Sequence, residues 1–153
     1  MTPEPQDTAW PIYTLRAVLE LIIPASYDGR MPSVAEYDVA GYARRRAPAD
    51  LAAIAAELER LETQAQQAFG SAFHALGADR RRAITDELRA REPAFLAQLA
   101  RLAAMCYYEQ DEVLSALGLD ARPPFPLGHH LEPSDLSLLD PVRKRAPLYR
   151  KVE

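Results

Sequence analysis

Residues 93–118 read PAFLAQLARLAAMCYYEQDEVLSALG, and this is the longest segment of the chain whose apolar residues keep the spacing of one helix face. The apolar positions recur at steps of three, four and seven: Phe95, Leu99, Leu102, Cys106 and Val113, with Leu96, Ala103 and Leu117 beside them. Each fully buried Leu or Phe stabilises a fold by about 1.5 to 3 kcal/mol. We therefore expect this stripe to form the centre of the core.

The helical pattern is interrupted at Tyr107-Tyr108-Glu109-Gln110, and Asp111 follows as a plausible N-cap. Gly118 is typical of a helix C-terminus. The segment is thus predicted to be two helices in line with a joint between them. The paired tyrosines are expected to pack half-buried at this joint, with a binding platform as the less favoured alternative.

Four further helices are predicted before this segment. The first starts after N-cap candidates Asp7 and Thr8 and ends at Pro24. The second runs from the capping box at Ser33 to about Arg45, and the third from Pro48 to about Phe69. Asp79 is the expected cap of the fourth. The predicted fold is all-α, a compact bundle of five to six helices with core residues Leu19, Ile22, Leu58, Leu99, Leu102 and Cys106.

The composition changes after Asp120, where six prolines fall within about twenty-five residues and exclude a long helix. We expect a helical domain over residues 1–120 and an extended, proline-rich arm over residues 121–153, basic at its end. The arm has too many apolar residues for a freely solvated linker. It should lie either on its own helical body or on another subunit, with these contact residues: Phe125, Pro126, Leu127, Leu138, Leu139, Pro141 and Tyr149.

Charge and composition exclude several classes of function. A net charge of −4 argues against nucleic acid as the main partner. No stretch is long and apolar enough to predict a membrane span, and the start MTPEPQDTAW does not predict a secretory signal. The expected location is therefore the cytoplasm, or the periplasm if a partner carries the chain there.

The sequence contains no recognisable catalytic or cofactor motif. The single Cys106 lies in the apolar stripe and is expected to be a buried structural thiol. His129 and His130 are adjacent, so an extended backbone directs their side chains to opposite sides, where they cannot easily share one metal ion. The sequence also lacks the Glu-x-x-His motif that is typical of metal sites in helix bundles. Phosphate loops and nucleophile elbows are missing as well. We expect no catalytic residue, no metal and no cofactor in this chain.

Two runs of three arginines could also contact a partner or an anion. The triplet that ends at Arg46 falls at a helix C-terminus, where cations are favourable, so it is expected to be a solvated cap. The triplet that begins at Arg80 falls in the first turn of a helix, where positive charge is unfavourable. Plain solvation is the favoured interpretation of this second triplet, and a salt bridge or a partner contact is the alternative.

The order of these pieces resembles the gluconate 2-dehydrogenase subunit 3 family. The resemblance is carried by the opening helix into Pro24-Ala25, the Asp-Gly loop, the restart Ser33-Val34-Ala35-Glu36, Phe73-His-Ala-Leu76, the helix ending at Tyr107-Tyr108, and Pro-Pro-Phe-Pro-Leu-Gly128. It covers roughly residues 15–128.

This resemblance implies a small subunit beside a large flavin-dependent dehydrogenase of the glucose-methanol-choline type, with FAD in the large subunit and haem in a cytochrome subunit. Many members begin with a twin-arginine signal. Here Arg44-Arg45 and Arg80-Arg81 are internal and lack a following apolar region, so they do not predict that signal.

The sequence and the resemblance together support three hypotheses for the function. The leading hypothesis is a non-catalytic small subunit that stabilises a flavin-dependent oxidoreductase, with the arm wrapped on its partner. The alternative is a self-contained helical adaptor or regulator that binds another protein. The least favoured is a small helical enzyme that uses Cys106, Tyr107 or Tyr108.

Overall fold

The computed structural model describes residues 10–122, 125, 128 and 132–146. The chain divides into two units, one ending at Ala121 and the other starting at Arg122. The described residues form helices and turns and contain no β-strand. The predicted all-α, compact fold is confirmed.

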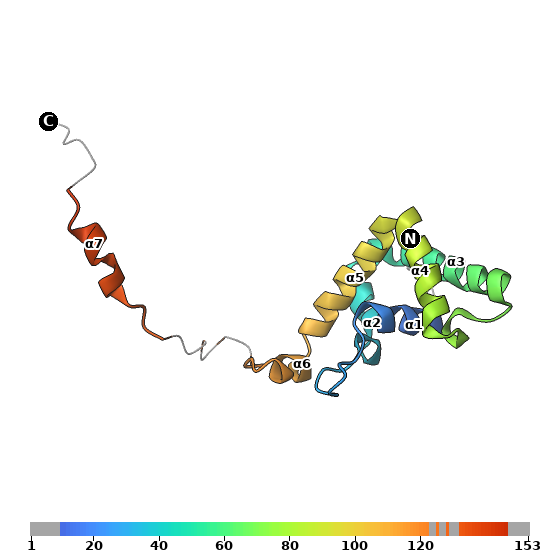
Figure 1. The fold of residues 1–153 in the computed structure, drawn as a ribbon, viewed down its shortest axis with the longest axis horizontal. Coiled ribbons are helices and arrows are strands. Elements are labelled where there is room, and N and C mark those ends of the chain that lie inside the picture. The colour runs from blue at the N-terminus through green and yellow to red at the C-terminus, as the bar shows by residue number, and fades with distance from the viewer. Residues whose placement is uncertain (1–9, 123–124, 126–127, 129–131, 147–153) are drawn as a thin grey trace, which may run out of the picture. The chain divides into compact units, whose positions relative to one another are not determined.

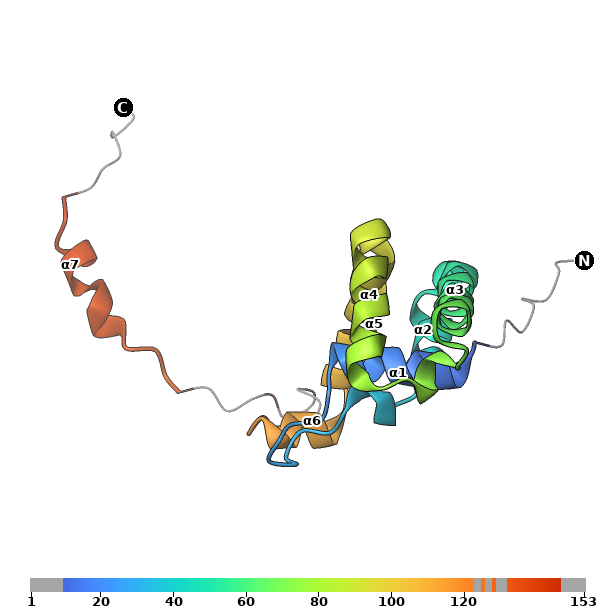
Figure 2. The same cartoon turned by 45° about the vertical axis from the view of Figure 1, so that its right-hand side comes forward.

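The described part of the first unit, residues 10–121, contains six α-helices: α1 (Ile12–Ile22), α2 (Val39–Arg46), α3 (Leu51–Phe69), α4 (Ala78–Arg91), α5 (Pro93–Tyr108) and α6 (Asp111–Ala116) (Figure 1). Three short 3₁₀ turns connect them: η1 (Val34–Glu36), η2 (Pro48–Asp50) and η3 (Phe73–Ala75). Helix α1 contacts α3, α4 and α5 as well as η1 and η3, so it is the central element of this unit. Figure 2 shows α4 alongside α5, with α1 crossing near the start of α4.

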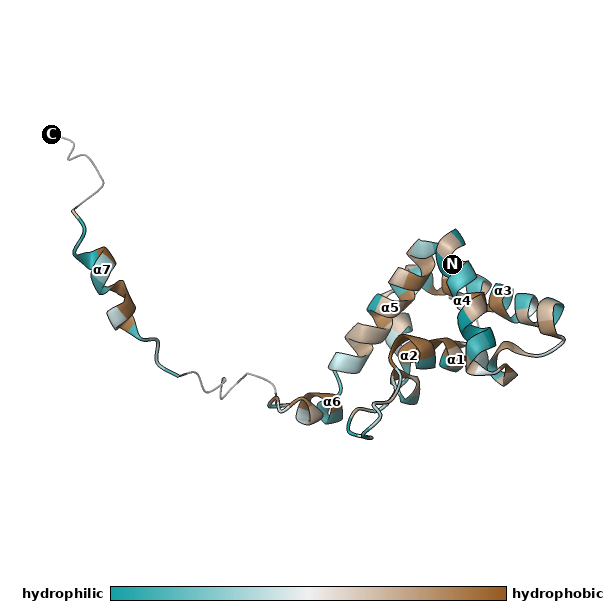
Figure 3. Ribbon diagram, viewed as in Figure 1, coloured by the Kyte–Doolittle hydropathy of each residue, from teal (hydrophilic) through white to brown (hydrophobic). Residues whose placement is uncertain are grey.

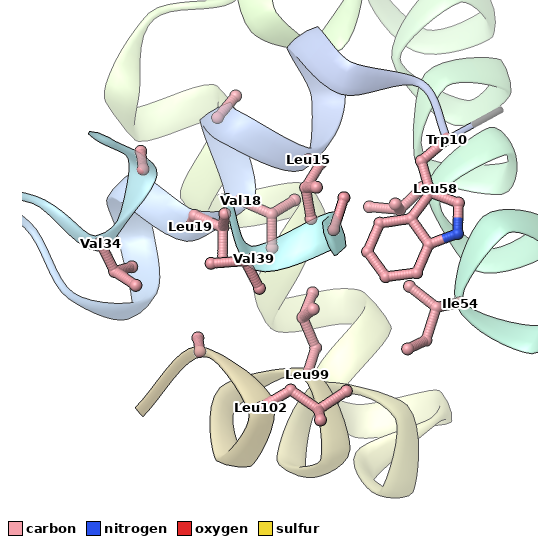
Figure 4. Close-up of a cluster of buried hydrophobic side chains, with 14 of the residues drawn as sticks. Trp10, Leu15, Val18, Leu19, Val34, Val39, Ile54, Leu58, Leu99 and Leu102 are labelled. Carbon is pink, nitrogen blue, oxygen red and sulfur yellow. The ribbon is translucent and has the colours of Figure 1, made fainter. Parts of the chain in front are cut away.

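The core lies where α1, α2, α3 and α5 meet. Figure 4 shows side chains from all four helices pointing into one cluster, with the Trp10 ring closing it near Ile54 and Leu58. The indole Nε1–H of Trp10 donates to the carbonyl of Leu51 at 3.2 Å, so its polar edge is satisfied where the ring is buried. The cluster contains the predicted core residues Leu19, Leu58, Leu99, Leu102 and Cys106.

The sixth predicted core residue, Ile22, is partly buried and packs against this cluster. Ile22 is the last residue of α1, and the chain leaves the helix at Ile23. It lines a hollow whose other wall includes Ala97 and Ala100 of α5. Ile22 therefore lies at the edge of the core, beside this hollow.

The predicted joint within residues 93–118 is confirmed as the break between α5 and α6. Pro93 takes the first position of α5, where its missing N–H costs nothing. The N-cap of α6 is Gln110 rather than Asp111, and its side-chain amide donates to the carbonyl of Cys106 at 2.6 Å. The N-cap residue of α6 is therefore hydrogen-bonded to the last turn of α5, whose own C-cap is Glu109.

Three other predicted helix starts were wrong. The N-cap of α1 is Pro11, not Asp7 or Thr8, which lie outside the described residues. The Ser33–Glu36 capping box forms, but it closes only η1, and the backbone is extended at Tyr37 before Asp38 caps α2. The Asp38 carboxylate accepts from Gly41 N–H at 2.8 Å, and a Cβ at residue 41 would collide with that carboxylate. Gly41 is thus required by the cap. Helix α4 starts after Gly77, which leaves Asp79 inside its first turn.

Among its described residues, the second unit has a short helical turn, η4 (Leu136–Leu139) followed directly by α7 (Asp140–Arg143). The Asp135 carboxylate caps this turn by accepting from Ser137 N–H at 3.0 Å. Pro141 lies in the first turn of α7, and Arg143 pairs with Asp140 at 3.3 Å. Local interactions therefore fix the conformation of this turn.

Candidate partner-contact surfaces

The side chains that sequence reasoning considered for catalysis have structural roles. Cys106 is buried, and burial, followed by the negative charges of Asp38 and Glu109, raises the pKa of its thiol. A thiol with a raised pKa is a poor nucleophile. Within the part of the chain that the structure describes, no three His, Cys, Asp or Glu side chains gather to hold a metal ion.

The tyrosines near the α5–α6 joint form a packed aromatic group. The Tyr107 hydroxyl donates to the carbonyl of Pro32 at 2.8 Å, and its ring meets Tyr37 and Tyr108 edge-on, with centroids 5.9 and 5.3 Å away. Burial, and then the neighbouring Glu112 carboxylate, raise the pKa of Tyr37 to about 12. Tyr107 is buried and Tyr108 is exposed, so only the second tyrosine of the pair is accessible from solvent.

The triplet that ends at Arg46 behaves as a helix cap. Arg46 pairs with Glu109 at 3.5 Å, and the Tyr42 hydroxyl donates to the same carboxylate at 2.8 Å, which ties α2 to the end of α5. Arg44 and Arg45 are exposed, and no carboxylate of the described residues lies within 4.0 Å of either. This matches the predicted solvated cap.

The apolar residues of η4–α7 are exposed. Figure 3 shows hydrophobic residues along this turn. Leu138 is 75% exposed, and Leu136, Leu139 and Val142 are exposed as well. Arg143, Lys144 and Arg145 follow directly, so the surface is apolar with a basic end.

The other predicted contact residues are placed as follows. Phe125 is 84% exposed, and Pro141 lies within α7. Pro126, Leu127 and Tyr149 lie outside the described residues. The structure therefore brings Leu138, Leu139 and Pro141 together in one turn.

The arginine triplet in the first turn of α4 has three different partners. Arg81 pairs with Glu20 of α1 at 2.9 Å, and Arg82 lies 3.9 Å from Asp79. The Arg80 guanidinium lies over the ring of Phe69, 5.0 Å from its centroid. Phe69 is the last residue of α3 and is exposed. The salt-bridge alternative is thus correct for Arg81.

A hollow of about 380 Å³ lies beside Arg81. We call it the basic pocket and define it by residues of α1, η3 and α4: Tyr13, Arg16, Ala17, Glu20, His74 and Arg81. Sequence reasoning did not find it, because its residues come from three elements and show no motif. The run of arginines in the first turn of α4 was the one available signal.

A second hollow, of about 350 Å³, lies between the end of α1, α4 and the start of α5. Its floor is apolar and includes Ile22, Leu96 and Ala97, with Thr85 and Arg89 beside it. Within the described residues, no helix is both long enough and apolar enough to cross a membrane.

The comparisons with known proteins give one match. Residues 11–120 match the protein family described as gluconate 2-dehydrogenase subunit 3. The match spans α1 to α6 and stops before the Pro-Pro-Phe-Pro-Leu-Gly128 segment. No curated protein and no solved structure matches the chain. Since the matched region covers more than two thirds of the 153 residues, the chain belongs to the gluconate 2-dehydrogenase subunit 3 family.

Proposed function

We propose that the chain is a non-catalytic accessory subunit that binds and stabilises an FAD-dependent dehydrogenase of the glucose-methanol-choline type, such as a gluconate or sugar dehydrogenase. The observation that carries this proposal is the family match, which includes every α-helix of the first unit. Fold alone does not imply function, so the proposal also needs a surface suited to a partner.

The proposed division of labour leaves the redox chemistry to the partners. FAD belongs to the large subunit, and a cytochrome subunit is a further expected partner. The described chemistry of this chain supports that division. The Cys106 thiol is buried with a raised pKa, and the Tyr107 hydroxyl is engaged by the Pro32 carbonyl, so both groups are committed to the fold.

We assign the main contact to the η4–α7 turn together with Phe125. Its exposed leucines each stabilise a complex by about 1.5 to 3 kcal/mol when fully buried against a partner. The Asp135 cap and Pro141 hold the turn in its helical form, which lowers the entropic cost of docking. A short helical turn with an exposed apolar face is suited to bind in a hydrophobic groove of another protein.

The test is co-purification of a flavin-dependent dehydrogenase with the tagged chain after co-expression. The double variant Phe125→Ala and Leu139→Ala should weaken the binding free energy of the complex by a few kcal/mol, because it removes one aromatic and one aliphatic side chain from the proposed contact. Tyr27→Ala is the control, since Tyr27 is an exposed large side chain like Phe125 and Leu139 but lies in the loop after α1.

Loss of the dehydrogenase with the double variant and its retention with Tyr27→Ala is the expected result. Equal retention by all three proteins would refute the arm contact. Failure of the wild-type chain to retain any flavoprotein would count against the accessory-subunit proposal itself.

A further inference from the structure

We propose that the basic pocket receives carboxylate side chains from an acidic segment of the partner. That the partner is a dehydrogenase rests on the proposed function, whereas the acidic chemistry of the contact rests on the pocket alone. This would be a second contact, separate in sequence from the η4–α7 turn.

The pocket is built by contacts that fix its walls. On α3, one oxygen of the Glu62 carboxylate accepts from the Thr14 hydroxyl at 2.7 Å and from Phe73 N–H at 3.2 Å. Glu62 thereby holds η3 against α1 and places His74 next to Tyr13, whose ring centroid lies 5.2 Å from that of the imidazole. The third wall is held by the ion pair of Arg81 with Glu20.

The donors in the pocket exceed the acceptors available to them. No carboxylate of the described residues lies within 4.0 Å of the exposed Arg16 guanidinium. Arg81 is only 18% exposed and pairs with Glu20, yet its Nε–H has no acceptor within the described structure. A guanidinium presents five N–H donors in a planar fork that matches a carboxylate. Among the residues that line the pocket, the single carboxylate of Glu20 is therefore outnumbered by the guanidinium groups of Arg16 and Arg81.

The sign of the charge here is opposite to that of the body around it. Residues 1–121 carry 18 acidic and 12 basic side chains. Next to the pocket, however, Arg80 and Arg82 add positive charge in the first turn of α4, where Asp79 is the one acidic residue. A positive surface on an acidic body attracts acidic protein segments, while the remaining charge repels the phosphates of nucleic acid.

The rim of the pocket has the composition of a protein contact. Tyr13 is 67% exposed although its ring packs on His74, so one face of a fixed aromatic is available. Tyrosine and arginine are enriched among the residues that dominate binding at protein interfaces. These features favour a protein segment over a free anion.

The test uses the full chain and a fluorescent peptide of eight glutamates, with an eight-glutamine peptide and an eight-nucleotide single-stranded DNA as comparison probes. Binding is followed by fluorescence anisotropy at about 50 and 200 mM salt, a range in which surface electrostatics change strongly. The glutamate peptide should bind, the glutamine peptide should not, and the affinity should fall as salt rises.

Three variants separate the pocket from a general charge effect. Arg16→Gln with Arg80→Gln should weaken binding about tenfold. The matched control, Arg44→Gln with Arg45→Gln, removes the same charge from an exposed site at the end of α2 and should change affinity less than about twofold. Glu20→Gln should tighten binding about fivefold, because the neutral amide oxygen can still accept from Arg81 and hold this wall, whereas the negative charge that competes for Arg81 is gone.

Equal losses in the two arginine variants would overturn the proposal, as would weaker binding by Glu20→Gln. Glu59→Gln, an exposed carboxylate on α3, controls for the change in net charge and should not tighten binding comparably. Tighter binding of the DNA than of the glutamate peptide would also overturn the proposal in favour of a nucleic-acid surface. All these outcomes are independent of whether a dehydrogenase co-purifies.

Discussion

Truncating Leu99 and Ile22 separately distinguishes the packing seen in the structure from that expected from helical spacing. Leu99 has no exposed surface and lies at the centre of the cluster in Figure 4. Leu99→Ala should therefore lower the free energy of unfolding by about 3 to 5 kcal/mol, the usual range for a Leu→Ala cavity in a core. Ile22 is half-buried at the edge of an open hollow, so Ile22→Ala should cost only about 1 to 2 kcal/mol.

The measurement is thermal and urea unfolding of the purified chain, followed by circular dichroism at about 222 nm. For a body of this size the expected decreases in Tm are about 10 to 20 °C for Leu99→Ala and about 3 to 8 °C for Ile22→Ala. Leu119→Ala, an exposed leucine after α6, is the control and should shift Tm by no more than about 2 °C. Equal costs for Leu99→Ala and Ile22→Ala would refute the placement of Ile22 at the rim of the hollow.

Three other outcomes follow from buried groups and from the arm. Cys106 should react slowly with a thiol reagent in the folded protein and rapidly in denaturant, since burial raises its pKa; fast native labelling would mean that α5 faces the other way. Tyr37 has a folded pKa of about 12, above the ordinary value near 10, so the unfolded chain loses the proton first and stability should fall as pH rises from about 10 to 12. Tyr37→Phe should flatten that part of the pH–stability curve, and an unchanged slope would exclude Tyr37 as its source. Deleting residues 122–153 should leave a cooperative melting transition, whereas its loss would show that the arm completes the core.

The helices were predictable from the sequence because their apolar spacing is long and regular. Residues 51–69 and 93–108 show this most clearly, and both are helices in the structure. Helix ends were less predictable, because several residues near each end can act as caps. Ser33 and Asp38 are both good caps five residues apart, and only the geometry shows that Ser33 closes a 3₁₀ turn while Asp38 starts α2.

The surfaces were less predictable than the core, for a physical reason. Ile22 lines a hollow together with Ala97 and Ala100, which lie far away in the sequence. The basic pocket depends on Glu62, whose contacts bring His74 to α1 across 48 and 11 residues of chain. Neither the hollow beside Ile22 nor the basic pocket can be recognised from the spacing of neighbouring residues in the sequence. For the leucines of η4–α7, by contrast, composition led to the expectation of a contact with the chain's own body or with another subunit, because a polar linker would not contain them, and that contact stays a prediction.

The most direct test of the accessory role is the unfolding temperature of a flavin-bound dehydrogenase, measured with and without this chain. Release of the flavin on heating raises its fluorescence and reports the unfolding of the large subunit. A subunit that binds the native dehydrogenase at about 100 times its dissociation constant should stabilise it by about 2.7 kcal/mol. The account predicts a rise in that unfolding temperature that saturates as the chain is added. An unfolding temperature that stays constant over the whole titration would contradict it.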